Sequence, residues 1–183
     1  MFAIAGNEFS GLSFGLIIPK MIFDKKYAIV GNSGSGKSTL AKRIQAQTGA
    51  RILDLDNITW ERGVRIQKRL TIEDSLAQLR AFIDEEPSSW IIEGCYGELI
   101  EQSLTYSPTF IFLDPGEKIC LDHCRNRPWE PHKYSSKSEQ DKMLEFLLSW
   151  VSEYYRREGP MSQQFHQRLF EDYKNSKFLN PKF

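Results

Sequence analysis

The chain has 183 residues, and its 24 lysines and arginines balance 24 aspartates and glutamates for a formal net charge of zero. This length allows one compact domain with a substantial core, and a hydrophobic share of 40% argues against a disordered chain. The neutral charge makes nucleic-acid binding unexpected, and no apolar run approaches the roughly 20 residues that a membrane span needs.

Residues 1–20 differ from the rest of the chain, and we expect them to form an N-terminal extension ahead of a domain at 21–183. They contain three glycines, and polar residues interrupt the apolar stretch that a secretory signal requires. Met21 is a plausible alternative translation start, because the first strong strand follows shortly after it. The apolar residues 16–18 equally allow an added strand or a packing arm.

From Met21 onward, short apolar runs alternate with longer amphipathic stretches. We expect strands at 27–30, 51–56, 90–92 and 109–113, with a weaker strand near 177–179. Helices are expected at 37–48, 71–86, 117–126, 138–157 and 161–175. Uniformly apolar strands that alternate with helices predict a parallel sheet buried on both faces. The expected fold is therefore a single three-layer α/β/α domain, of the α/β class, with a central parallel sheet of about five strands.

The most specific motif, GNSGSGKST at 31–39, directly follows the first expected strand and opens the first expected helix. It matches the pattern G-x-x-x-x-G-K-S/T, whose glycines allow successive backbone N–H groups to point at one phosphate. The helix dipole adds to the attraction. Lys37 is expected to reach the β- and γ-phosphates, and Ser38 to offer its hydroxyl to Mg²⁺. The nucleotide-binding residues expected from this motif are Gly31, Ser33, Gly34, Ser35, Gly36, Lys37, Ser38 and Thr39.

Acidic residues follow the expected strands, at the edge where an open parallel sheet binds its ligand. Asp54 and Asp56 end the second strand, Glu93 follows the third, and Asp114 follows the fourth. Phosphoryl transfer requires a carboxylate near the metal, and often another that accepts the proton of the acceptor hydroxyl. We expect Glu93 in the first role, with Asp54 as a further metal ligand, and Asp56 in the second. The alternative is that such acids cap the next helix or are solvated in a loop.

Two basic segments have positions from which they could close on anionic groups. Residues 61–70 (ERGVRIQKRL) lie between the second strand and the next helix, where an anionic acceptor would enter, although a solvated loop explains them equally well. Residues 125–137 form an expected lid that begins RNRPWE. Arg125 or Arg127 would neutralise charge on the transferred phosphoryl group, unless the aromatic residues of this segment only anchor a structural loop.

The cysteines carry little functional signal. Cys120, His123 and Cys124 lie at helical spacing, but a closed zinc site needs a fourth ligand, so packing residues are the better interpretation. Cys95 has no paired histidine that would make it a nucleophile. Three cysteines without a disulfide framework favour a reducing, cytoplasmic setting. Residues 156–157, both arginines, are expected to be a solvated helix end rather than part of a cleft.

This arrangement resembles the small P-loop kinases, the group that contains adenylate, shikimate and gluconate kinases. The Asp54-x-Asp56 strand end looks like the acceptor strand of shikimate kinases, and 90–96 (WIIEGCY) resembles the strand and Asp-Gly turn of nucleoside monophosphate kinases, with Glu for Asp. A closer likeness, over roughly residues 25–180, is to uncharacterised P-loop ATPases and topology modulation proteins. These share the Asp56-x-x-x-Trp60 pattern, the Trp-Ile-Ile-Asp/Glu-Gly strand and an Arg-rich segment after the fourth strand.

The resemblance implies the P-loop NTPase fold, binding of ATP and Mg²⁺, and a mobile lid. The chain also departs from these families. It lacks the glycine run that follows the third strand of shikimate kinases, and it has VSEYY at 151–155 in place of their R-x-P-L-Y motif. The arginine after the Asp-Gly turn of nucleoside monophosphate kinases is missing as well. Neither shikimate nor a nucleotide is therefore implied as the acceptor.

The sequence predicts an ATP-dependent kinase that transfers the γ-phosphate to a small-molecule acceptor. The alternative is a nucleotide-dependent regulatory protein, or a slow ATPase, without a small-molecule acceptor. Its expected partners are a nucleotide and a small molecule, with no membrane contact. The residues expected to be catalytic are Lys37, Asp56, Glu93, Arg125 and Arg127. The expected metal ligands are Ser38, Asp54 and Glu93.

Overall fold

The computed structural model of the protein describes residues 25–61, 68–130 and 134–179. The expected extension at 1–20 and Met21 lie outside these ranges, as do Arg62 and Arg65 of the basic segment and residues 131–133 of the lid. Within the described ranges, no helix is both long and apolar enough to cross a membrane.

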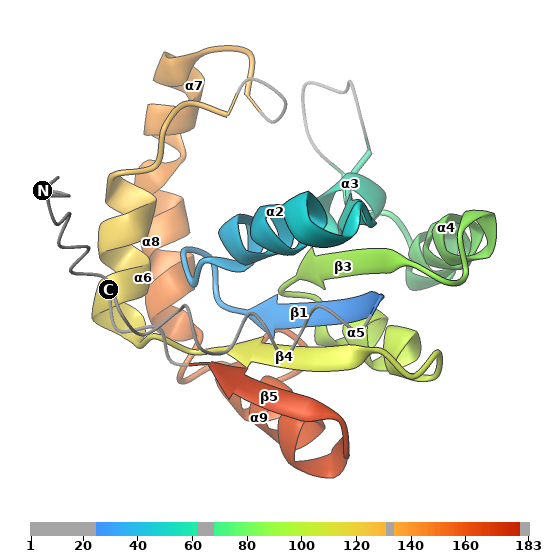
Figure 1. The fold of residues 1–183 in the computed structure, drawn as a ribbon. Coiled ribbons are helices and arrows are strands. Elements are labelled where there is room, and N and C mark those ends of the chain that lie inside the picture. The colour runs from blue at the N-terminus through green and yellow to red at the C-terminus, as the bar shows by residue number, and fades with distance from the viewer. Residues whose placement is uncertain (1–24, 62–67, 131–133, 180–183) are drawn as a thin grey trace, which may run out of the picture.

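The described strands form one parallel sheet of five strands in the order β2–β3–β1–β4–β5 (Figure 1). The strands are β1 (Lys26–Gly31), β2 (Arg51–Asp54), β3 (Trp90–Gly94), β4 (Thr109–Leu113) and β5 (Ser176–Leu179). Every neighbouring pair is parallel, so all five carboxyl ends lie at one edge of the sheet. The expected α/β class and the expected number of strands are both confirmed.

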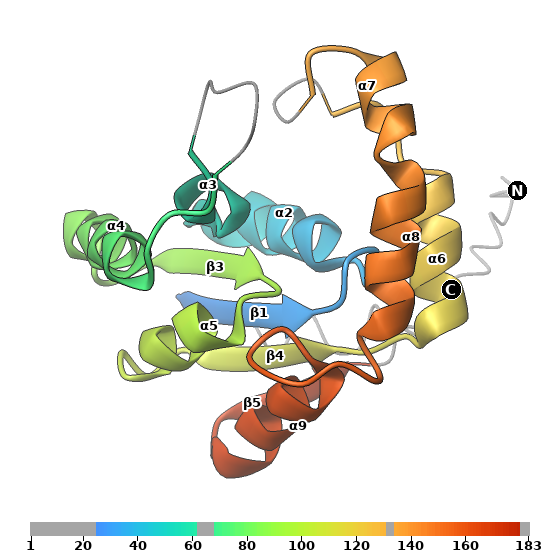
Figure 2. The ribbon, with the colours of Figure 1, turned by 180° about the vertical axis from the view of Figure 1, so that it is seen from behind.

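Helices cover both faces of the sheet, which gives the three layers of the predicted domain. α2 (Lys37–Thr48) lies on one face, whereas α4 (Ile72–Glu85), α5 (Gly97–Leu104) and α9 (Gln163–Asp172) pack on the other (Figure 2). Thr71 caps α4, because its Oγ1 accepts a hydrogen bond from the Asp74 backbone N–H at 3.1 Å.

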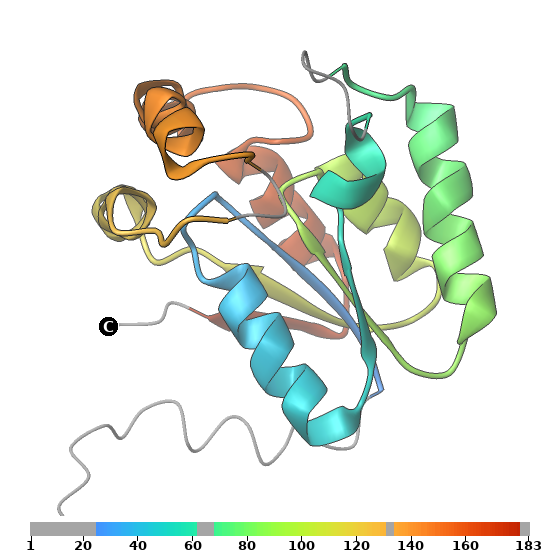
Figure 3. The same cartoon turned by 90° about the horizontal axis from the view of Figure 1, so that it is seen from above.

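The α6–α8 pair stands beside the sheet, at the edge toward which the strands point (Figure 1 and Figure 3). It consists of α6 (Glu117–Arg125) and α8 (Leu144–Glu153), and the short α7 (Lys137–Lys142) precedes α8. Cys120 and Cys124 of α6 pack against Val151 of α8 in a small core of their own. The two cysteines are therefore packing residues, as expected, and within the described ranges no cluster of three or more His, Cys, Asp or Glu side chains forms a metal site.

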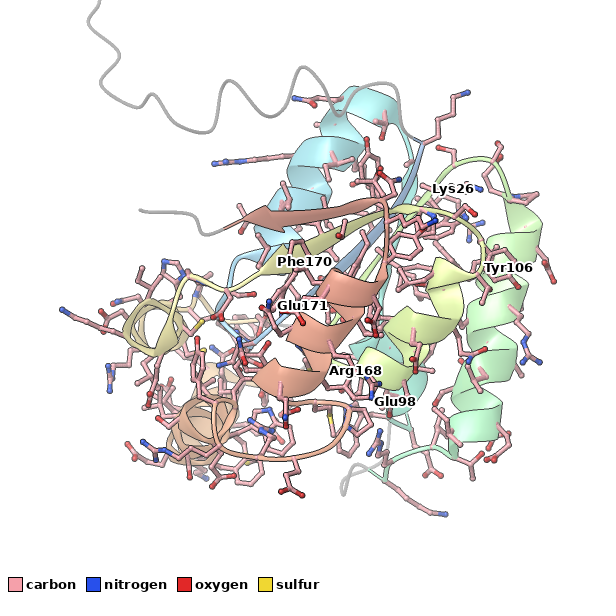
Figure 4. All side chains as sticks on the ribbon, turned by 90° about the horizontal axis from the view of Figure 1, so that it is seen from below. Lys26, Glu98, Tyr106, Arg168, Phe170 and Glu171 are labelled. Carbon is pink, nitrogen blue, oxygen red and sulfur yellow. The ribbon has the colours of Figure 1, made fainter. Side chains whose placement is uncertain are left out.

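Alternate residues of the central strands face the two helical layers, which explains why β1, β3 and β4 are mostly apolar. In β1, Tyr27 and Ile29 pack in the core under α2, whereas Ala28 and Val30 pack in the core shared by α4, α5 and α9. At the amino end of β1, Lys26 Nζ donates a hydrogen bond to the Tyr106 carbonyl oxygen at 2.6 Å (Figure 4). This bond ties the start of the central strand to the end of α5.

Two helices were not expected from the sequence. The strand expected at 51–56 ends at Asp54, because Asp54 Oδ1 accepts a hydrogen bond from the Asp56 N–H at 3.0 Å and turns the chain into α3 (Asp56–Thr59). α5 has eight residues and begins at Gly97, only three residues after the end of β3. A segment so short, opened by glycine, has too little periodicity to indicate a helix.

The helix expected at 138–157 is divided into α7 and α8. Met143, with φ −87° and ψ −5°, ends the first helix and begins the second, and α8 stops at Glu153. The helix expected at 161–175 is α9, which starts later because Ser162 caps it by accepting from the Phe165 N–H at 3.1 Å. The final strand expected near 177–179 is β5.

We expect Ile83→Ala to lower the free energy of unfolding by about 3 kcal/mol, because the Ile83 side chain in α4 is fully buried and its loss leaves a cavity. The matched control is Ile72→Ala in the same helix, where the side chain is 39% exposed and the expected change is below about 1 kcal/mol. Urea unfolding followed by circular dichroism measures both variants. Equal losses of unfolding free energy in the two variants would contradict the assignment of Ile83 to the buried face of α4.

Candidate functional site

The glycine-rich loop packs tightly against β4 and α6. A Cβ atom on Gly31 would stand 2.3 Å from the Leu113 carbonyl oxygen, and one on Gly34 would stand 2.3 Å from that of Cys120. Gly34 also has a φ of +78°, a backbone conformation that L side chains rarely adopt. The loop therefore requires glycine at both positions for close approach, and at Gly34 for backbone conformation as well.

Hydrogen bonds within the loop hold Lys37 in position. Lys37 is the first residue of α2 and only 8% exposed, and its Nζ donates to the Asn32 carbonyl oxygen at 2.8 Å. The Ser35 N–H donates to the same oxygen at 3.2 Å. Asn32 is itself fixed, since its Nδ2 donates to the Val151 carbonyl oxygen of α8 at 2.9 Å and its Oδ1 accepts from the Ser33 N–H at 2.9 Å. The ammonium group is thus oriented by the loop.

A cleft of about 650 Å³ opens above this loop. Its walls are residues 33–40 of the loop and α2, the acids at the ends of β2 and β3, and residues 126–130 of the lid. Seven of the eight expected nucleotide-binding residues line it. The exception, Gly31, lies behind the loop, where it permits the contact with β4. The Ser35 hydroxyl is buried and has no hydrogen-bond partner among the residues that the structure describes.

The three acids of the prediction come together in this cleft. Asp54, Asp56 and Glu93 all line it, and the sheet register places Asp54 beside Glu93 on neighbouring strands. Glu93 is 3% exposed. Asp114 is absent from the lining, and its carboxylate accepts hydrogen bonds from the Tyr155 hydroxyl at 2.6 Å and from Gln163 Nε2 at 3.4 Å. Asp114 therefore ties the end of β4 to the segment between α8 and α9.

Asp56 has a partner that the sequence did not reveal. The Tyr96 hydroxyl donates a hydrogen bond to Asp56 Oδ1 at 2.7 Å, and Trp60 Nε1 donates to the Tyr96 oxygen at 2.8 Å. The only sequence signal for this contact is that Tyr96 follows the strand that carries Glu93.

Arg125 and Arg127, which the sequence predicted as alternatives for one role, have different surroundings in the structure. Arg127 lines the cleft, and its Nη1 lies 3.3 Å from Oε2 of Glu130, which lines the cleft as well. Arg125 is exposed at the end of α6, outside the cleft lining, and its Nη1 pairs with Asp122 Oδ1 at 3.1 Å. Of the two, only Arg127 is placed where it can reach a phosphate in the cleft.

Two groups near the cleft have strongly shifted pKa values. Burial, followed by the charge of Asp56, raises the pKa of the Cys95 thiol to about 12, so this cleft residue stays protonated and is no nucleophile. Burial lowers the pKa of His166 to about 3, so its ring is neutral. His166 Nε2 lies 3.1 Å from the Cys95 carbonyl oxygen, and Nδ1 lies 2.7 Å from the Tyr154 hydroxyl. His166 thus connects the turn at Cys95 to the segment after α8.

For two further side chains, the structure differs from what the sequence led us to expect. His123, which was set aside with the cysteines, lines the cleft, and its Nδ1 donates to the Gly34 carbonyl oxygen at 2.7 Å. Arg157 is partly buried rather than solvated, because its guanidinium stacks on the Trp150 ring at 3.5 Å and bonds to the Trp150 carbonyl oxygen. Neither contact has a local sequence signature.

The central strand β1 of the parallel sheet leads through the glycine-rich loop into α2, as the sequence predicted. No protein-family model matches this sequence, and no curated protein does.

Several similar solved structures are kinases of low sequence identity. A sugar kinase from Janibacter sp. is 21% identical with a TM-score of 0.45, over 83% of this chain and 96% of its own. A gluconokinase from Sinorhizobium meliloti is 18% identical with a TM-score of 0.44, over 82% and 95%. A shikimate kinase from Acinetobacter baumannii, in complex with shikimate, is 14% identical with a TM-score of 0.38, over 84% and 94%.

We expect His166 to make the protein less stable as the pH falls. Between pH 6.5 and pH 3 the unfolded chain protonates this histidine and the folded chain does not, so the free energy of unfolding falls by up to about 1.4 kcal/mol per pH unit. At pH 5 this amounts to about 2 kcal/mol. Urea unfolding at pH 7 and pH 5 should show a smaller loss for His166→Gln than for wild type. An equal loss in both proteins would contradict the buried neutral ring.

Proposed function

We propose that this protein is an ATP-dependent kinase that transfers the γ-phosphate of ATP to a hydroxyl group of a small-molecule acceptor. The observation that carries the proposal is one cleft lined by both the phosphate loop with Lys37 and the three acids Asp54, Asp56 and Glu93. Phosphoryl transfer needs cations for the phosphates and carboxylates for a metal and a proton, and the two sets face the same space. The three free cysteines of the described ranges agree with a cytoplasmic location, which we propose as well.

The loop fits the triphosphate of a nucleotide. Backbone N–H groups at the start of α2 and the Lys37 ammonium are the donors that bind phosphate oxygens at helix N-termini. Arg127 would add a second cation from the lid side once it exchanges Glu130 for a phosphate. The proposed phosphate site would thus have two cations, Lys37 from the loop and Arg127 from the segment after α6.

The donor set at the strand ends fits Mg²⁺. The Ser38 hydroxyl and the carboxylates of Asp54 and Glu93 are hard oxygen ligands, which this ion prefers. Mg²⁺ usually keeps several water and phosphate ligands, so it does not require a site built from protein groups alone. When bound, it would neutralise charge on the phosphate oxygens.

Asp56 is the proposed proton acceptor. The acceptor oxygen attacks the γ-phosphorus, the bond from the γ-phosphorus to the oxygen that bridges the β-phosphate breaks, and ADP leaves. The hydroxyl proton passes to the Asp56 carboxylate, which later releases it to solvent. Asp56 lies in the cleft with the phosphate loop, as this role requires.

We expect Lys37→Ala to remove most of the affinity for MgATP, because no other side chain of the loop carries a positive charge. Titration calorimetry with MgATP measures the loss, which should exceed about tenfold, equal to about 1.4 kcal/mol. Lys118→Ala, which removes an exposed lysine of α6 outside the cleft, should bind as wild type. Unchanged ATP-dependent thermal stabilisation in Lys37→Ala would refute nucleotide binding at this loop.

Arg127→Ala should weaken MgATP binding by about tenfold, since it removes a cation from the cleft and leaves the Glu130 charge without that partner. Arg125→Ala removes the same type of side chain two residues away and should change the affinity less than about twofold. Calorimetry at one ionic strength compares the two variants. The opposite ranking would mean that Arg125 is the lid arginine that reaches the nucleotide.

The acceptor can be found by incubating metabolite extracts with ATP and the enzyme, and by searching for new phosphorylated masses. Lys37→Ala is the control, because a genuine product must disappear with it. Turnover of equal, slow rate across a broad panel of acceptors would contradict the kinase assignment.

A nucleotide-dependent regulator is the second candidate function. Among the described residues, three of the four exposed large hydrophobic side chains (Trp129, Met143 and Phe146) lie between the lid and the start of α8. Such side chains can contact a protein partner. Stimulation of ATP hydrolysis by the macromolecular fraction of an extract, and not by its small-molecule filtrate, would favour this function.

A further inference from the structure

We propose that Tyr96, held by Trp60, is a positioning residue that fixes the orientation of the Asp56 carboxylate for proton transfer. The inference rests on the role proposed above for Asp56. It extends that role to two aromatic residues which themselves need not touch a substrate.

The two hydrogen bonds that link Trp60, Tyr96 and Asp56 can have only one donor-to-acceptor direction. An indole N–H can only donate, so the Tyr96 oxygen accepts from Trp60 Nε1 at 2.8 Å. The Tyr96 hydroxyl proton then points to Asp56 Oδ1, which lies 2.7 Å away. A hydroxyl that accepts one hydrogen bond becomes a stronger donor in the next, so the indole strengthens the contact with Asp56.

Tyr96 remains a donor over the whole working pH range. Its side chain is 3% exposed, and burial, followed by the negative charge of Asp56, raises the pKa of its hydroxyl well above the usual value. The bond to Asp56 therefore persists wherever Asp56 is ionised.

Both aromatic residues are fixed by the backbone around them. Trp60 forms an antiparallel bridge with Arg69, and the Leu70 N–H donates to the Thr59 carbonyl oxygen at 2.8 Å beside it. Tyr96 precedes α5, and its carbonyl oxygen accepts the N–H groups of Leu99 and Ile100 at 3.1 Å and 3.0 Å.

The guanidinium of Arg69 adds a further restraint on this pair. It lies 5.9 Å from the Tyr96 ring centroid and pairs with Glu98 Oε1 at 2.8 Å. Arg69, the bridge partner of Trp60, is thereby joined to Glu98 in the first turn of α5, just after Tyr96.

A fixed carboxylate matters because proton transfer needs hydrogen-bond contact with the reacting hydroxyl. The χ2 torsion of aspartate is broad, so an unrestrained carboxylate spends part of its time turned away. A donor on one oxygen restricts that rotation. The loss of the Tyr96 hydroxyl should therefore slow turnover while MgATP binding stays intact.

The test measures hydrolysis of γ-labelled MgATP, with water as the acceptor, in wild type, Tyr96→Phe, Trp60→Phe, Asp56→Asn and the double variant Asp56→Asn/Tyr96→Phe. Tyr96→Phe should lower kcat by about tenfold and leave KM for MgATP within about twofold. Trp60→Phe should have a smaller effect of the same kind. In the Asp56→Asn background, Tyr96→Phe should have no further effect, because Tyr96 acts through Asp56.

Tyr173→Phe is the matched control. It removes a hydroxyl that donates to the Pro108 carbonyl oxygen at 2.9 Å, far from the cleft lining, and should leave kcat unchanged. Thermal unfolding of every variant separates loss of fold from loss of turnover.

The possible outcomes distinguish this inference from the proposed function. A wild-type kcat in Tyr96→Phe, or an equal loss with and without Asp56, would overturn the positioning role alone. Wild-type turnover in Asp56→Asn would remove the roles of both Asp56 and Tyr96, although nucleotide binding would stand. A wild type that releases labelled phosphate no faster than Lys37→Ala would overturn the positioning role with water as the acceptor, whereas the proposed function is tested separately by MgATP binding and by the search for the acceptor.

Discussion

Close packing around the phosphate loop is the constraint on which the rest of the structure depends. The loop connects the central strand β1 to α2, and it touches the end of β4 and the middle of α6 through glycines that leave no room for a side chain. Because the sheet is parallel, the neighbouring strands end at the same edge and deliver their acidic residues next to this loop. The backbone N–H groups of the loop and the carboxylates at the strand ends therefore lie close together at one edge of the sheet.

The zero net charge of the chain conceals a strong local pattern in the cleft. The basic residues are Lys37, Lys42, Arg43 and Arg127, and the acidic residues are Asp54, Asp56, Glu93 and Glu130. Two of the four acids, Asp54 and Glu93, lie in strands of the sheet, whereas none of the basic residues does. This mixture of charges suits the anion and the metal ion that we propose for the same space, and a uniformly basic surface would not.

The sequence predicted those parts of the fold and the site that depend on local patterns. Apolar strands, the glycine motif and acids at strand ends are each recognisable from a few consecutive residues, so the sequence alone places Lys37, Asp54, Asp56 and Glu93 at one edge of the sheet, and all four line one cleft. The contact of Tyr96 with Asp56 joins residues 40 positions apart and has no local signature. The same holds for His166 and Cys95, which are 71 positions apart. Only the fold could pair them.

The two helices beside the sheet both contact the glycine-rich loop. His123 of α6 donates to the Gly34 carbonyl oxygen, and the Val151 carbonyl oxygen of α8 accepts from Asn32. A substitution that breaks either contact would therefore disturb the loop that carries Lys37 as well as the packing of the α6–α8 pair.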